Sequence, residues 1–397
     1  MHSRLTARKA VVGAALIAIV TLAVALSASA GTKHANGNTI LIGSIAGTTG
    51  AYGSTGVAMV NGAKLAVADL NARGGALGKK FTLQSYNDQA SATLSSQLFQ
   101  RLVSAGAVAG AGSGDTGPAT SAMAQRLHIP NIGAVDDAGI TIYPKGPSQP
   151  PYDWVWSWGL NTFAWGGIAA HYAQSNCKGL AVLHDPSTYG GGGDAAIKLA
   201  YKGSSKKIVL DDSISEDWST GATVGLNNEI NKIKKAGADC VVVWLTPQDT
   251  ARFMQTLKST GTKLTVLGND EINADPTFSN LAKSAGDGAI GATLTTQLHP
   301  TAALSSFYKR YKARFHIAAT PFAVANYDAI MMLGQVIKTT KSTDPNKLKD
   351  GLNNVKNYHG LQGTVSFSKQ NHATITEKQL TLVKYNAAKN AWVPIQK

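Results

Sequence analysis

Residues 112–117 have the sequence Gly-Ser-Gly-Asp-Thr-Gly, which matches the G-x-G-x-x-G pattern of dinucleotide-binding turns. The motif follows an apolar run and precedes a predicted helix, and Asp136 and Asp137 follow about 20 residues later, where a ribose-binding acid would lie. Such a turn exposes backbone N–H groups at the positive end of a helix dipole. It therefore predicts a site for an anionic or polar group, and a dinucleotide is one group that would fit.

The sequence motifs of other catalytic and metal sites are absent or incomplete. The sequence contains no G-x-S-x-G, no H-E-x-x-H and no C-x-x-C. Two S-x-x-K matches, at 306–309 and 366–369, lack the S-D-N and K-T-G companions of serine acyl-transfer enzymes. We therefore predict that the protein is not an enzyme and uses no cofactor and no metal. An exported oxidoreductase with bound NAD is the alternative that the glycine motif leaves open.

Two successive sets of alternating strands and helices would position these residues. The first set has strands at 39–46, 81–88, 107–112 and 129–137, and the second at 179–185, 207–214, 240–245 and 263–270. Such alternation predicts an α/β fold with two doubly wound parallel-sheet lobes. The strands predicted at 364–368 and 380–386 are too few for a third sheet, so we expect them to complete the first two.

Ligands of open parallel sheets bind beyond the carboxyl ends of the strands. The residues expected there are unusually polar in both sets: Tyr52, Asp88, 113–116, Asp136 and Asp137 in the first, and 185–189, 246–249 and 269–271 in the second. Two such edges facing each other would form a cleft for a small polar solute. The glycine run 190–193 is expected to be a flexible strand-to-helix turn rather than a phosphate loop.

The N-terminus has the layout of a secretory signal peptide. Basic residues at positions 4, 8 and 9 precede an apolar run at 10–26 and small residues at 28–30. We predict a signal peptide at 1–30, a polar leader at 31–37 and export to the periplasm or cell envelope. Without a cysteine near the cleavage site, the protein is not expected to be a lipoprotein. An uncleaved membrane anchor is the alternative, because the run is only a little short of a spanning helix.

The distribution of charge limits which kinds of partner the protein is expected to bind. The chain has 37 Lys and Arg against 23 Asp and Glu, scattered over helices without an aromatic-interleaved stripe. This pattern indicates a solvated basic surface and no nucleic-acid partner, with contact to an anionic envelope surface as a further option.

The two cysteines, Cys177 and Cys240, both lie at or just before the start of predicted strands. If those strands are neighbours, the two cysteines are expected to form a disulfide in an oxidising compartment.

The segment 40–89 resembles the opening of the leucine/isoleucine/valine-binding family of type I periplasmic binding proteins, including a helix that ends in LNARGGALGKK. The similarity continues through TGPATSAMAQRLHIPNI, LAVLHDPSTYGGG, GADCVVVWL, TVLGNDEI and YDAIMML, and covers nearly the whole predicted mature chain. No single motif is specific, but their combination is.

The resemblance implies two lobes joined by three crossings, near Leu160, Thr295 and Gln379. The implied lobes are 38–160 plus 295–378, and 161–294 plus 379–397. A monomer of this kind would close on a small polar solute, of the amino-acid or amide type, and deliver it to the permease and ATPase subunits of an ABC importer. A sensory module of the same fold, signalling to a membrane partner, is the alternative.

The resemblance also assigns contacts with the solute. Ser113, Gly114 and Thr116 would hold a carboxylate through hydroxyl and backbone N–H groups, and Tyr52 would form a wall. On the second lobe, Tyr189 and Asp270 would contact the solute, with Asp270 placed to meet an amine.

Two features depart from the family pattern. Asp115 and Asp136 stand where hydroxyl residues are expected, and with Asp137 they favour a cationic, amide or hydroxyl-rich solute over a simple carboxylate. A helix N-cap is the other interpretation of Asp115, and a solvent-facing loop acid that of Asp137. Trp154, Trp156 and Trp158 share one face of a strand. At least two are expected to pack beneath the crossing, while Trp158, with Trp244 and Gln248, is a candidate for the cleft wall.

Overall fold

The computed structural model describes residues 38–50, 53–114, 116–133, 141–145, 149–217, 222–223, 225–274, 276–373 and 375–395. The predicted signal peptide and leader therefore lie outside the described residues, as do Tyr52, Asp115, Asp136 and Asp137. Residues 34–397 form one compact unit. No helix in the described ranges is both long and apolar enough to cross a membrane.

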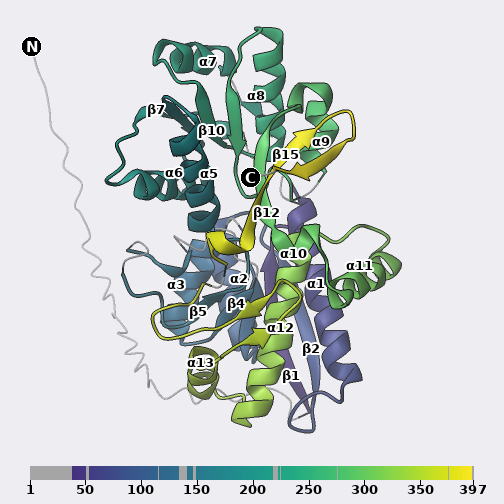
Figure 1. Cartoon of the computed structure of the whole chain (residues 1–397). Coiled ribbons are helices and arrows are strands. Elements are labelled where there is room, and N and C mark those ends of the chain that lie inside the picture. Colours follow the sequence, from purple (N-terminus) through teal and green to yellow (C-terminus); the bar gives the residue numbers. More distant parts are fainter. Residues whose placement is uncertain are drawn as a thin grey trace, which may run out of the picture. The chain divides into compact units, whose positions relative to one another are not determined.

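The first sheet contains five parallel strands in the order β2-β1-β3-β4-β5 (Figure 1). These strands are β1 (Thr39–Ala46), β2 (Lys80–Asn87), β3 (Ala109–Gly112), β4 (Asn131–Gly133) and β5 (Val155–Ser157). The helices between them are α1 (Gly53–Ala72), α2 (Ala92–Ser104) and α3 (Gly117–Leu127). From the C-terminal part of the chain, α11 (Ala302–Phe315) and α12 (Pro321–Thr340) pack against α1, and α13 (Pro345–Asn353) packs against α12.

The second sheet has the strand order β16-β15-β12-β11-β10-β6-β7. Its parallel strands are β6 (Leu180–His184), β7 (Ile208–Ser213), β10 (Cys240–Trp244), β11 (Thr265–Gly268) and β12 (Ile290–Leu294). β15 (Leu380–Asn386) and β16 (Ala391–Pro394) extend it as antiparallel strands. Its helices are α5 (Thr162–Asn176), α6 (Thr188–Tyr201), α7 (Leu226–Lys235), α8 (Pro247–Ser259) and α9 (Thr277–Ala282), followed by a 3-10 turn at Lys283–Gly286. The predicted α/β class with two parallel sheets is confirmed.

One strand prediction was wrong. The segment predicted as a strand at 364–368 contributes only β14 (Thr364–Val365), which pairs with β13 (Tyr358–His359) and joins neither large sheet. The intervening turn is held by Asp328 of α12, whose carboxylate accepts the backbone N–H groups of Leu361 (2.9 Å) and Gln362 (3.0 Å). The strand predicted at 380–386 does join the second sheet, as β15. A further small hairpin pairs β8 (Glu216–Asp217) with β9 (Ala222–Thr223).

Residues at the three predicted crossings contact one another. Leu160 lies between β5 and α5, Thr295 begins the short helix α10 (Thr295–Leu298) directly after β12, and Gln379 ends the 3-10 turn Glu377–Gln379 directly before β15. The Thr295 hydroxyl donates to the carbonyl of Gln379 (3.1 Å), and Asn161 Nδ2 donates to the carbonyl of Ile375 (2.8 Å). The lobe boundaries remain a prediction, and these contacts are consistent with it.

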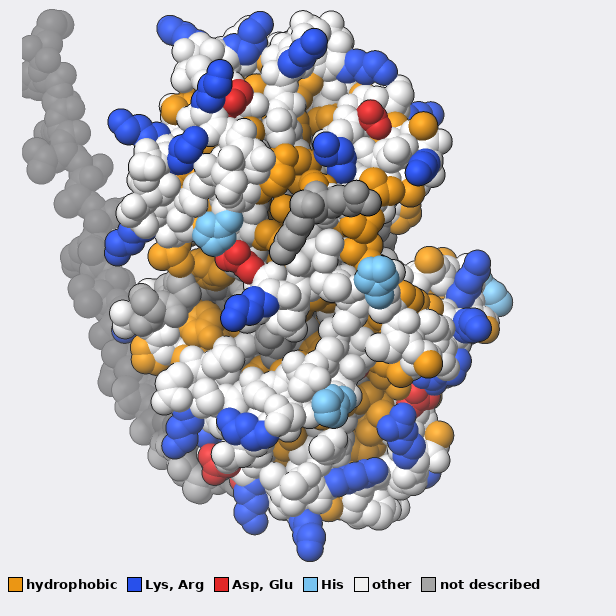
Figure 2. Space-filling model, viewed as in Figure 1, with side chains coloured by type: hydrophobic (Ala, Val, Ile, Leu, Met, Phe, Trp, Pro, Cys, Tyr) orange, Lys and Arg blue, Asp and Glu red, His pale blue; other side chains and the backbone are white. Residues whose placement is uncertain are grey.

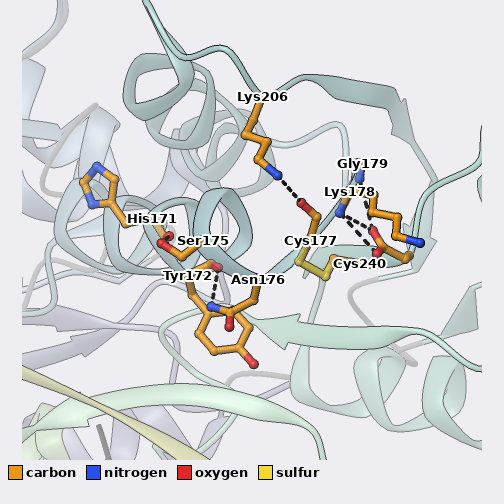
Figure 3. The surroundings of a disulfide bond; sticks show 10 residues. His171, Tyr172, Ser175, Asn176, Cys177, Lys178, Gly179, Lys206 and Cys240 are labelled. Carbon is orange, nitrogen blue, oxygen red and sulfur yellow. Dashed lines mark hydrogen bonds between the residues drawn. A yellow bond between two sulfur atoms is a disulfide. The ribbon is translucent and has the colours of Figure 1, made fainter.

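The structure contains the predicted disulfide between Cys177 and Cys240, whose Cα atoms are 5.9 Å apart (Figure 3). Cys177 directly follows α5, and Cys240 begins β10, which pairs with β6 in the sheet. The bond therefore lies at the amino edge of the second sheet, opposite the carboxyl edge.

Candidate functional site

The strand order of each sheet reverses at one place. In the first sheet β2 and β3 lie on opposite sides of β1, and in the second β7 and β10 lie on opposite sides of β6. The crevices outside the carboxyl ends at such a reversal are the usual ligand sites of open α/β sheets. The loops after β1, β3, β6 and β10 are therefore the natural candidates, and they include most of the predicted site residues.

The turn after β3 has the geometry that the glycine motif predicts. Gly112 has φ 87°, and a side chain there would come within 2.7 Å of the carbonyl of Ile45. Ser113 also has positive φ, and its N–H donates to the same carbonyl (2.6 Å). Its side chain is buried and accepts a hydrogen bond from the hydroxyl of Thr120 in α3 (2.8 Å). Gly114 follows at the approach to α3, with its carbonyl accepting the N–H of Gly117 (2.7 Å).

The Thr116 side chain forms hydrogen bonds with two other buried side chains of the first sheet's loops and helices. Its hydroxyl donates to Asp88 Oδ2 (2.6 Å) and accepts from the hydroxyl of Ser95 (3.0 Å), and all three side chains are buried. Because a hydroxyl has one proton, Thr116 in this state cannot donate a hydrogen bond from its side chain to a solute carboxylate. The network fixes the turn after β3 against the turn after β2, a long-range contact that its sequence position does not reveal.

At the second sheet, the glycine run 190–193 lies within the first turns of α6, so the prediction of a flexible turn was wrong. A side chain on Gly190 would overlap the carbonyl of Asp185, and one on Gly193 would overlap the indole of Trp244. The glycines therefore let α6 begin directly against the ends of β6 and β10. Ser187 caps this helix by accepting the N–H of Tyr189 (3.1 Å).

The Trp244 side chain is completely buried under α6, with its ring centroid 6.0 Å from that of Tyr189. Within the described part of the chain, its indole Nε1 has no hydrogen-bond partner. Gln248 is partly exposed in the first turn of α8, which Thr246 caps by accepting the N–H of Asp249 (3.2 Å).

Tyr189 and Asp270 meet at the carboxyl edge of the second sheet. The Tyr189 hydroxyl donates to Asp270 Oδ1 (2.6 Å), and Asp270 is 2% exposed. Asp270 Oδ2 has no partner among the residues that the structure describes. Burial raises the pKa of Asp270 to about 6, partly offset by the bond from Tyr189.

Other buried acids follow the strands at the same edge of the sheet. Asp185 directly follows β6, and burial raises its pKa, an effect opposed by hydrogen bonds from Ser187. Asp249 is fully buried and accepts a hydrogen bond from Arg252 (2.8 Å). Glu271 is also buried. The carboxyl edge of the second sheet is therefore acidic, and this favours a solute with a positive charge.

Trp158 lies at the end of β5 and is 1% exposed. Its ring packs edge-on against Tyr358 at 5.3 Å, and its indole hydrogen-bonds Asp328. Burial raises the pKa of Asp328 to about 7. Trp154 and Trp156 are also buried, with Trp154 stacked on His128 and Trp156 on His372. Asp328 was not among the predicted site residues. The sequence feature that could have identified it is the presence of an acid in the otherwise largely apolar helix predicted at 320–340.

Among the described residues, a group of three side chains could hold a metal by position. His184, Asp194 and Asp211 offer ligand atoms within 4.8 Å of one another. The ammonium of Lys198 already bonds both Asp194 (2.6 Å) and Asp211, so a cation occupies this place.

Comparisons with known proteins agree with this architecture. A family model described as periplasmic binding protein matches residues 39–390. The leucine-specific-binding protein of Salmonella typhimurium is 22% identical over 337 residues, covering 82% of this chain and 85% of that protein.

Solved structures show the same fold. A type 1 periplasmic binding protein from Bordetella pertussis has a TM-score of 0.79 at 21% identity, covering 90% of this chain and 100% of that one. The branched-chain amino acid binding protein LivJ from Streptococcus pneumoniae, in complex with isoleucine, has a TM-score of 0.75 at 21% identity, covering 91% and 100%.

The matching family consists of periplasmic binding proteins, and the relative named above is a leucine-binding protein. The prediction that the protein is not an enzyme is thereby confirmed. The chain therefore belongs to the periplasmic binding protein family and is similar to its leucine- and Leu/Ile/Val-binding members.

Proposed function

We propose that this protein is the exported binding component of an ABC importer and that it captures a small, polar, amine-bearing solute between the carboxyl edges of its two sheets. The glycine-rich turn at 112–117 would offer backbone N–H groups to the acceptor end of the solute. The Asp270 and Tyr189 side chains would receive the amine. Closure of the two lobes around the solute would follow, because only the closed state allows both sets of contacts.

The observation that carries this proposal is the half-satisfied carboxylate of Asp270. A buried carboxylate with one unpaired oxygen is costly, and the cost is reflected in its raised pKa. An ammonium group of the solute would supply the missing hydrogen bond and the opposite charge. The acids at the same edge add to the preference for a cation.

A thermal-shift screen of the protein from His34 onward, after denaturation and refolding to remove bound solute, tests the proposal. The panel contains amino acids, amides, polyamines, betaines, sugars, aromatic acids and NAD. A solute at a hundredfold its dissociation constant stabilises the folded state by about 2.7 kcal/mol, a shift that is readily seen. We expect amine-bearing solutes to give the shift. A response to sugars or NAD alone would contradict the proposed solute class.

The Asp270→Asn variant should bind the same solute about 10- to 100-fold more weakly, because a charge-assisted hydrogen bond is lost. Asp287→Asn, on an exposed acid at the other edge of the sheet, is the matched control and should bind normally. Wild-type affinity should fall as the pH drops below about 6, where the free Asp270 becomes neutral. Uptake by cells lacking the gene should be restored by the wild type and not by Asp270→Asn.

A further inference from the structure

Lysines are concentrated at the amino edge of the second sheet. Lys178, Lys207 and Lys263 lie within two residues of the starts of β6, β7 and β11, and Lys235 ends the helix before β10. Because parallel strands begin at one edge, these residues converge there. Lys283 precedes β12, and Lys389 lies in the turn between β15 and β16, which reaches the same edge because β15 is antiparallel to β12. We call these six residues the lysine face.

All six lysines are exposed, and in the described ranges none of them forms an ion pair. The two acids in the connections to this edge are Asp239 and Asp287, and both accept backbone N–H groups. Figure 3 shows Lys178 and Lys206 extending beside the disulfide at this edge. Figure 2 shows Lys and Arg side chains spread around the end of the molecule where Figure 1 places α7 and α8. The lysine face therefore carries a high positive charge that few neighbouring acids neutralise.

Helix dipoles explain only part of this pattern. A lysine in the last turn of a helix, such as Lys235 in α7, is stabilised by the negative end of the dipole. Lys207, Lys263 and Lys389 lie beyond the last turn and cap of any helix, where the dipole offers no such reason. The opposite edge of the same sheet carries the buried acids of the candidate site, so charge is separated along the strands.

Exposed apolar side chains accompany the lysines. Leu199 is 48% exposed in the last turn of α6, Val209 is 39% exposed at the start of β7, and Leu281 is 45% exposed in α9, two residues before Lys283. These apolar side chains would make no favourable contact with a soluble polyanion. The interface of a bilayer combines anionic headgroups with accessible acyl chains, and surfaces that bind it combine basic and apolar side chains.

We propose that the lysine face binds reversibly to the surface of a bilayer containing anionic phospholipids, with lysines at the headgroup phosphates and Leu199 and Leu281 in the interface. This contact would hold the protein near membrane-embedded partners. It leaves the carboxyl edge of the sheet, where the solute site is proposed, away from the lipid.

Co-sedimentation of the protein from His34 onward with phosphatidylcholine vesicles, with and without phosphatidylglycerol, tests this inference without any solute. We expect binding only to the vesicles that contain phosphatidylglycerol, weakening as salt is added. The variant with Lys207→Gln, Lys235→Gln, Lys263→Gln and Lys389→Gln should bind about tenfold or more weakly. Leu199→Ser with Leu281→Ser should weaken binding by about threefold or more.

The matched control removes the same charge from exposed lysines of α11, α12 and α13, namely Lys309→Gln, Lys312→Gln, Lys338→Gln and Lys347→Gln. Its vesicle binding should stay close to that of the wild type. An equal loss in both variants would show that net charge alone is responsible and would overturn the proposal. Binding to polyphosphate but not to vesicles would also overturn it, in favour of a soluble polyanion. Melting temperatures of all variants confirm that they are folded.

Discussion

His372 is 1% exposed, its Nδ1–H donates to the carbonyl of Val155 (2.9 Å), and its ring stacks on Trp156 with centroids 4.7 Å apart. Burial lowers its pKa from 6.5 to about 4. The unfolded chain therefore takes up a proton as the pH falls below 6.5, while the folded protein does not. Stability is lost across this window, by about 3 kcal/mol at pH 4.

Urea unfolding at neutral and acidic pH measures this effect. His372→Gln removes the titrating group, so its stability should fall less between pH 7 and pH 4 than that of the wild type. The comparison between variants is needed because Asp270 and Asp328, whose pKa values are raised, act in the opposite direction and favour folding as the pH falls. His299→Gln, on an exposed histidine, is the matched control for the substitution itself. An identical profile for His372→Gln would refute this assignment.

At the scale of elements, α6 depends on glycines in its first turns. A methyl group on Gly193 would overlap the indole of Trp244, whereas one on Gly191 would meet no atom within 4 Å. We expect Gly193→Ala to lower the free energy of unfolding by about 1–3 kcal/mol through overpacking. Gly191→Ala should instead raise it by about 0.5–1 kcal/mol, because alanine is the better helix former. Equal effects of the two substitutions in urea titrations would contradict the packing described for α6.

At the scale of the whole molecule, the Cys177–Cys240 disulfide links residues 63 positions apart. Replacing both cysteines by alanine should cost about 2–4 kcal/mol, because the unfolded chain regains the freedom that the bond removes. The variant should melt at a lower temperature, and reduced wild type should match it. Solute affinity should be retained, because the bond lies at the amino edge. A melting temperature that does not change on reduction, with both thiols titrating, would show that the bond contributes no stability.

Much of the architecture could be predicted from the sequence. The alternation of apolar runs with amphipathic segments depends on local residue periodicity, so the βα sets and the residues at strand ends were identified without a structure. The disulfide could be predicted, on condition that the two strands are neighbours, because both cysteines lie at or just before the starts of predicted strands. The segment 364–368 was misassigned because its strand-like composition does not show that Asp328 holds the preceding turn away from both sheets.

The sequence by itself determined the fold class, the polar character of the strand ends and the family. Only the tertiary structure decided how those polar groups are used. It places the Thr116 hydroxyl on Asp88, Trp158 against Asp328, and Gly193 against Trp244, and it leaves one oxygen of Asp270 without a partner in the described chain. The physical reason is that local patterns determine which residues reach an edge, whereas the partner of a buried polar group comes from a segment distant in sequence.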